Sequence, residues 1–107
     1  MEISQYEIVL VNLDPTVGSE IQKTRPCVVI SPDEINHNLR TVVIAPMTTK
    51  NSSYPTHVKV KHNNQAGWVV FDQIRTIDKV SIVKVLGNLN ASEIAACKSV
   101  IKETFID

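Results

Sequence analysis

The sequence predicts a mainly β fold: a small curled antiparallel sheet or barrel of about six or seven strands, with one short helix and a C-terminal amphipathic helix. Short runs rich in Val and Ile recur between clusters of Pro, Gly and Asn, which is typical of small antiparallel proteins. The C-terminal segment instead repeats apolar residues at helical spacing. With 107 residues the chain is expected to form one domain over residues 1–107, large enough for a core without disulfides.

The first two predicted strands flank a long polar loop. Residues 7–11 (EIVLV) and 27–30 (CVVI) are apolar, β-rich runs that are expected to be buried. Between them, Asp14-Pro15-Thr16 favours a turn, and Pro26 suits the first residue or the edge of a strand because it cannot donate to a ladder. Long loops in compact domains are usually functional, so we expect this loop to form one wall of a substrate site.

A short helix is expected after the second strand. The segment Ser31-Pro32-Asp33-Glu34 is typical of a helix start, with the serine as cap, the proline at the first helical position and the glutamate completing a capping box. The helix is expected to end near Asn38. A third strand over residues 41–45 follows and is expected to be broken at Pro46.

The next predicted strand, residues 56–62, alternates in polarity. His57, Lys59 and Lys61 fall on one face, and two valines fall on the other. This pattern predicts a half-buried strand with a basic outer face.

Two further strands and the C-terminal helix complete the chain. A turn at 63–67 leads to a fifth strand that begins at Trp68, a core or interface residue, and runs on through residue 78. The sixth strand covers residues 80–86, with inward positions Val83, Val85 and Leu89. The helix is capped by Asn90 with Glu93 as its capping-box partner, and its apolar stripe is Ile94, Cys97, Val100, Ile101 and Phe105.

Charge and cysteine content narrow the function classes. Eleven basic residues balance eleven acidic ones, which argues against non-specific coating of DNA. Residues 21–62 nevertheless carry six basic residues against two acidic ones, so a local basic face is expected. Cys27 and Cys97 lie in apolar patterns and are expected to be buried hydrophobes rather than a disulfide or a nucleophile. No apolar run reaches the length of a membrane span and no signal-peptide pattern opens the chain, which indicates a cytoplasmic protein without a membrane partner.

Motifs for metal, nucleotide and acyl-transfer chemistry are missing from the sequence. His37, His57 and His62 fall into no ligand spacing, and there is no Cys-x-x-Cys, phosphate-binding glycine loop or nucleophile elbow. We therefore expect neither a metal site nor a cofactor. The remaining candidates are polar residues at predicted strand ends: Arg25, Thr48, Asp72, Gln73, Arg75 and Thr76.

Taken as an ordered set, these residues resemble a known family. The pieces are Leu13-Asp14-Pro15-Thr16-x-Gly18-Ser19-Glu20, Arg25-Pro26, Ser31-Pro32, Ala45-Pro46-Met47-Thr48, Tyr54-Pro55 and Asp72-Gln73-Ile74-Arg75-Thr76-Ile77-Asp78. In this order they are similar to the MazF/PemK (Kid) family of toxin endoribonucleases, over essentially the whole chain.

The resemblance implies a fold, partners and an activity. The fold would be an SH3-like barrel that forms a homodimer. The protein would be the toxin of a type II toxin–antitoxin system, held inactive by a MazE-like antitoxin that lies across the RNA groove. Its activity would be metal-independent cleavage of single-stranded RNA at short sequences by attack of the 2′-OH, which leaves a 2′,3′-cyclic phosphate or 3′-phosphate and a 5′-OH and arrests growth.

The resemblance also implies roles for residues. The family's catalytic Arg and Thr match Arg25 and Thr48. Some members use an Asp as base at the position of Asp72, but this chain has Val70 where one branch has a partner Arg. A base role for Asp72 and a role in holding Arg75 or a backbone turn both stay open. The expected RNA-binding residues are Ser19, Glu20, Lys23, Lys50, Asn51, Tyr54, His57, Lys59, Gln73 and Arg75.

Several of these interpretations have alternatives. Tyr54 either stacks on a base or packs beside Pro55. Ser19 stands where another branch member has a His, so a His-based pair at that position is excluded. The whole chain could instead be a CcdB-like gyrase poison, although it lacks the C-terminal Trp-Gly-Ile of such proteins, or an inactive barrel that only binds RNA or a peptide.

Overall fold

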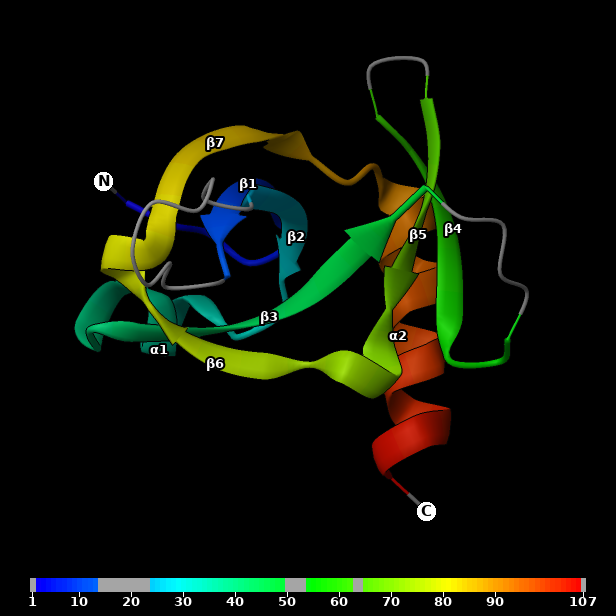
Figure 1. Cartoon of the computed structure of the whole chain (residues 1–107). Coiled ribbons are helices and arrows are strands. Elements are labelled where there is room, and N and C mark those ends of the chain that lie inside the picture. Colours follow the sequence, from blue (N-terminus) through cyan, green and yellow to red (C-terminus); the bar gives the residue numbers. More distant parts are fainter. Residues whose placement is uncertain (1, 14–23, 50–53, 63–64, 107) are drawn as a thin grey trace.

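The computed structural model describes residues 2–13, 24–49, 54–62 and 65–106. In these residues the strands are β1 (Glu7–Asn12), β2 (Thr24–Val29), β3 (Thr41–Thr48), β4 (His57–His62), β5 (Gln65–Val70), β6 (Arg75–Asp78) and β7 (Ile82–Asn88). The helices are α1 (Asp33–Asn38) and α2 (Ala91–Phe105), and the short 3-10 turns are η1 (Phe71–Gln73) and η2 (Lys79–Ser81). The predicted mainly β fold, a curled antiparallel sheet with one short and one C-terminal helix, is confirmed (Figure 1). Within the described residues, no helix is long and apolar enough to span a membrane.

β3 is the strand on which the sheet divides. The sheet order is β4-β5-β3-β2-β1-β7, with β6 also paired to β3. The early part of β3 lies between β2 and β6, with register pairs that include Cys27↔Pro46 and Ile44↔Arg75. Its last two residues pair instead with β5, through Met47↔Val69 and Thr48↔Trp68. The β4–β5 hairpin therefore stands away from the curl formed by β1, β2, β3, β6 and β7 (Figure 1).

The core has two clusters because β1, β2 and β3 are buried on both faces. Successive side chains of a strand point to opposite faces. Accordingly, Ile8 and Val28 belong to the cluster that includes Cys97 of α2, whereas their neighbours Val9 and Cys27 belong to the cluster inside the curl. These strands thus hold the two halves of the molecule together.

The predicted break at Pro46 is wrong, since β3 continues through it. Pro46 lies between Ile44, the last residue of β3 that pairs with β6, and Met47, the first that pairs with β5. None of the described strands pairs with β3 on this edge at Pro46, so the missing N–H of the proline costs no ladder hydrogen bond there.

The predicted single strand over 68–78 is also wrong. β5, which pairs with the last residues of β3, ends at Val70. The turn η1, which contains the buried Phe71, follows it and leads to β6, which pairs with the first residues of β3. The predicted turn at 63–67 extends too far, because residues 65–67 already belong to β5.

Three residues that were expected to face the core are exposed. Val83 and Val85 on β7 are 52% and 38% exposed, because β7 is an edge strand with register shifts against β1. Leu89 is buried as predicted, and Ile82 is buried in place of the two valines. Phe105 is 51% exposed because the last turn of α2 extends beyond the sheet (Figure 1). The buried Cys97 and the partly buried Ile94, Val100 and Ile101 follow the predicted stripe.

The two helices begin differently. The predicted capping box of α2 is confirmed, because Asn90 Oδ1 accepts from the Glu93 N–H at 2.8 Å and Glu93 Oε1 accepts from the Asn90 N–H at 2.9 Å. The predicted cap of α1 is wrong. Pro32 occupies the cap position, and no side chain of the described residues caps the helix.

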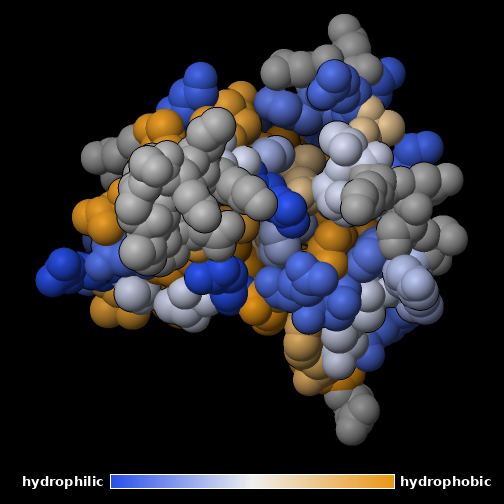
Figure 2. Space-filling model, in the orientation of Figure 1, coloured by the Kyte–Doolittle hydropathy of each residue, from blue (hydrophilic) through white to orange (hydrophobic). Residues whose placement is uncertain are grey.

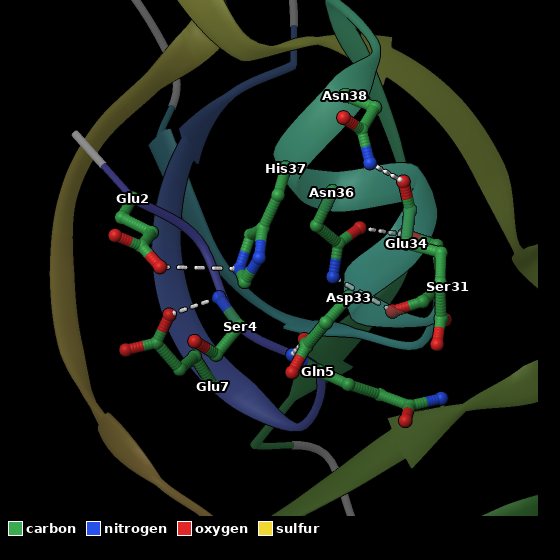
Figure 3. A network of polar contacts seen from close by, with 10 residues as sticks. All are labelled: Glu2, Ser4, Gln5, Glu7, Ser31, Asp33, Glu34, Asn36, His37 and Asn38. Atoms are coloured by element: carbon green, nitrogen blue, oxygen red, sulfur yellow. Dashed lines mark hydrogen bonds and ion pairs between the residues drawn. The ribbon is translucent and has the colours of Figure 1, made fainter.

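Ser31 instead turns into the protein. Its hydroxyl donates to Asn36 Oδ1, and Asn36 Nδ2 donates to the Ser31 carbonyl at 2.8 Å (Figure 3). The same hydroxyl accepts from the Val43 N–H at 3.0 Å. Ser31 and Asn36 are buried, and a buried donor or acceptor left unpaired is costly. The Ser31 side chain therefore links α1 to β3 by hydrogen bonds instead of capping the helix.

Candidate active-site cavity

A cavity of about 430 Å³ opens where β3 leaves β2 for β5. Its volume lies within the range of small-molecule binding pockets. Figure 2 shows this face hollowed between the curl and the β4–β5 hairpin, with apolar surface inside a mostly hydrophilic rim. The described residues that line the cavity are Thr24, Arg25, Pro26, Met47, Thr48, Thr49, His62, Gln65, Ala66, Gly67 and Leu86.

The structure brings Arg25 and Thr48 to this one cavity. Cys27 on β2 lies opposite Pro46 on β3. Because the strands are antiparallel, Arg25, two residues before Cys27, and Thr48, two residues after Pro46, lie toward the same end of the pair. Residues two apart on a strand share a face, so both side chains emerge on the same face of the diverging strands. Both residues line the cavity that this divergence opens.

Arg25 is exposed at the cavity. Among the residues that the structure describes, ion pairs join His37 to Glu2, Arg40 to Asp78 and His57 to Asp72, and none includes Arg25. An exposed guanidinium that no described carboxylate pairs with presents a planar fork of donors that fits two oxygens of a phosphate.

Cys27, two residues after Arg25 on β2, is no nucleophile. It is fully buried, as expected, and its Sγ lies 3.5 Å from the carbonyl oxygen of Arg25. Burial raises the pKa of the thiol to about 12, and the charges of Arg25 and Arg75 only partly offset this. The thiolate that nucleophilic chemistry requires is therefore scarce at neutral pH.

Asp72 lies in a different cluster. Its Oδ1 accepts a hydrogen bond from Thr56 Oγ1 at 2.9 Å and lies 3.1 Å from His57 Nε2. Tyr54, which is 68% exposed, meets the His57 ring edge-on at a centroid distance of 5.4 Å. None of these four residues is among the described residues that line the cavity. Asp72 thus holds Thr56, in the turn before β4, and His57, the first residue of β4, while no ion pair of the described residues joins it to Arg75.

The predicted basic outer face of β4 is only partly right. Lys59 and Lys61 are exposed and Val58 and Val60 are buried, as the alternation predicts. The side chain of His57, however, is only 9% exposed, because it turns back to Asp72.

The other predicted RNA-binding residues are dispersed or undescribed. Gln73 and Arg75 are exposed, and Arg75 lines a separate hollow with Asn12, Leu13 and Thr76. The remaining ones, Ser19, Glu20, Lys23, Lys50 and Asn51, lie outside the described residues.

Several residues that line the cavity were not among the predicted site residues, and His62 and Gln65 are two of them. They lie opposite each other across the β4–β5 ladder. The available signal was the period of two, which places His62 on the same face as the buried Val58 and Val60.

Replacing Asp72 by asparagine is expected to remove a small, pH-dependent part of the stability. The hydrogen bond from Thr56 lowers the pKa of Asp72 from its ordinary value of 3.8, with His57 contributing. A lowered pKa stabilises the fold above the unfolded value, and this contribution disappears as the pH falls through the folded value. Because the carboxylate is half exposed, we expect about 0.5–1 kcal/mol. Urea denaturation at pH 6 and pH 3 should show a difference between the wild type and Asp72→Asn at pH 6 that shrinks at pH 3. A difference that grows toward pH 3 would contradict this assignment.

Comparison with known proteins gives a consistent result. Residues 4–105 match the family model described as the PemK-like, MazF-like toxin of type II toxin-antitoxin system. The Endoribonuclease toxin MazF of Escherichia coli (strain K12) is 34% identical over 71 residues, which cover 66% of this chain and 64% of that protein. The chain thus matches slightly less than two thirds of that relative's length. The Endoribonuclease MazF of Staphylococcus epidermidis is 31% identical over 97 residues, 85% of this chain and 81% of that protein.

Solved structures show the same similarity. The Mycobacterium tuberculosis toxin MazF-mt6 superposes with a TM-score of 0.78 at 27% identity, covering 92% of this chain and 95% of that one. A MazE-MazF structure from Deinococcus radiodurans superposes with a TM-score of 0.82 at 25% identity, covering 96% and 95%.

Proposed function

The chain belongs to the PemK-like, MazF-like toxins of type II toxin–antitoxin systems, and from this premise we propose that it is an endoribonuclease that cleaves single-stranded RNA at short sequences without a metal ion. The observation that carries the proposal is the shared cavity of Arg25 and Thr48 at the divergence of β2 and β3. The similar proteins named endoribonucleases support the same activity.

RNA supplies its own nucleophile, the 2′-OH next to the cleaved phosphate. Its attack on phosphorus builds negative charge on the non-bridging oxygens, and preorganised donors aimed at developing charge are often the largest catalytic effect. In this proposal the Arg25 guanidinium binds these oxygens and the Thr48 hydroxyl donates a further hydrogen bond. Because the guanidinium supplies a positive charge to the phosphate oxygens, the proposed reaction needs no metal. The products are a 2′,3′-cyclic phosphate, or the 3′-phosphate, and a 5′-OH.

RNA binding extends beyond the cavity in this proposal. Single-stranded RNA is typically held by aromatic stacking and by cations that follow the backbone. Tyr54 offers an exposed ring, and Lys59 an exposed ammonium group on β4. We assign the choice of sequence to these residues together with the predicted Lys50 and Asn51.

The family membership also supports a protein partner for this chain. MazE-MazF structures are known from Deinococcus radiodurans, which supports a MazE-like antitoxin as the partner of this chain. We further propose a homodimer that acts on mRNA in the cytoplasm and arrests growth when the antitoxin is absent. The exposed valines of the edge strand β7 offer apolar surface for such an assembly.

The test is a cleavage assay on a long single-stranded RNA in the presence of EDTA, with the new ends mapped. We expect cuts at one short recurring sequence, with cyclic phosphate or 3′-phosphate on one side and 5′-OH on the other. Intact RNA with folded, dimeric protein would contradict the proposal, and inhibition of DNA gyrase in its place would favour the CcdB-like reading.

A further inference from the structure

The proposed reaction needs a group that removes the proton of the 2′-OH. Among the described residues that line the cavity, the ionisable side chains are those of Arg25 and His62. An arginine keeps its proton in proteins, so it is a poor base. Asp72, the predicted candidate, is engaged with Thr56 and His57 and is not one of the described lining residues. Imidazole is the side chain that most readily exchanges a proton near neutral pH.

The fold fixes the position of His62. It is the last residue of β4, it pairs with Gln65 on β5, and it follows the inward valines Val58 and Val60 at a spacing of two. The ring packs against Gly87 of β7, where an added Cβ would lie 3.1 Å from His62 Cε1. Gly87 thus leaves the space that the imidazole occupies beside the cavity.

The ring also has an unsatisfied nitrogen. His62 Nε2 is buried and has no hydrogen-bond partner among the residues that the structure describes. An unpaired buried polar atom is destabilising and calls for an explanation. His57 Nδ1 is in the same state, but its ring is held by Asp72 outside the described lining of the cavity.

From these observations we propose that His62 is the general base of this cavity, a role that rests on the proposed function. The 2′-oxygen attacks phosphorus as its proton passes to a ring nitrogen of His62. The bond from phosphorus to the 5′-oxygen breaks, and the leaving oxygen takes a proton from water. His62 then returns its proton to the solvent.

The test compares His62→Ala and His62→Gln with His37→Ala, a matched control whose imidazole lies on α1 beside Glu2. The substrate is a short RNA that contains the mapped cleavage sequence. We expect both His62 variants to lower kcat by about 10²–10⁴-fold, the usual contribution of a positioned acid or base. Added imidazole should restore part of the activity of His62→Ala, and His37→Ala should retain the wild-type rate. Denaturation midpoints establish that each variant is folded, and the glutamine variant retains the size of the side chain.

A second substrate separates base from acid. Sulfur in place of the bridging 5′-oxygen gives a leaving group that needs no protonation. For a base, His62→Ala slows this substrate by the same factor as ordinary RNA. Disappearance of the defect would make His62 the acid and overturn the proposal, as would wild-type rates in both His62 variants. A wild-type protein that leaves both substrates intact would instead contradict the proposed endoribonuclease itself.

Discussion

Replacement of Arg25 by alanine is expected to reduce RNA cleavage by at least about 10²–10³-fold, the usual cost of removing one preorganised donor to an oxyanion. The residue is exposed at the cavity, and no described carboxylate pairs with it. Removing it takes away one positive charge and both arms of the guanidinium fork at once. Single-turnover rates on the mapped RNA sequence would measure the loss.

Two further variants separate charge from geometry. Arg25→Lys keeps the charge but loses the bidentate fork, so we expect it to recover only part of the rate. Arg40→Ala is the matched control, because Arg40 is also exposed but lies beside Asp78, away from the described cavity residues. We expect the Arg40 variant to cleave at the wild-type rate.

Some results would redirect the interpretation. If Arg25→Ala still arrests growth while RNA stays intact, the protein would act by binding rather than by cleavage. Full cleavage by the folded Arg25→Ala protein would remove the guanidinium from the mechanism and reduce Arg25 to a residue at the start of β2.

Local patterns in the sequence were sufficient for much of the fold. Alternation placed Val58 and Val60 inside and Lys59 and Lys61 outside, and the Asn90 cap appeared as predicted. These features depend on neighbours within a few residues, so a single sequence contains the information.

The features that were missed depend on contacts distant in sequence. β3 continues through Pro46 because its neighbour on one edge changes from β6 to β5 at that point. Ser31 does not cap α1 because Asn36 and Val43 hold its hydroxyl. For the site, the family resemblance pointed to Arg25 and Thr48, and the structure adds their shared cavity. His62 could be recognised as a site residue only from the structure, which pairs it with Gln65 and includes it in the lining of the same cavity.

A substrate with a single 2′-deoxy nucleotide at the cleaved position is expected to resist cleavage completely. The proposed mechanism draws its nucleophile from that one hydroxyl, and nothing in the remaining RNA can replace it. Binding should change little, by about twofold or less, because stacking and phosphate contacts dominate the recognition of single strands. The modified RNA should therefore act as a competitive inhibitor of cleavage of the unmodified one.

The control is the same RNA with the deoxy nucleotide one position away, which should be cut at a rate close to that of unmodified RNA. Cleavage of the first substrate would show that water or a protein group attacks the phosphate. In that case the cavity would have to position an external nucleophile, and Arg25 and Thr48 would stabilise a different transition state from the one proposed. Resistance of both substrates would instead indicate that the neighbouring 2′-OH is needed for binding, which a loss of competition by the control RNA would reveal.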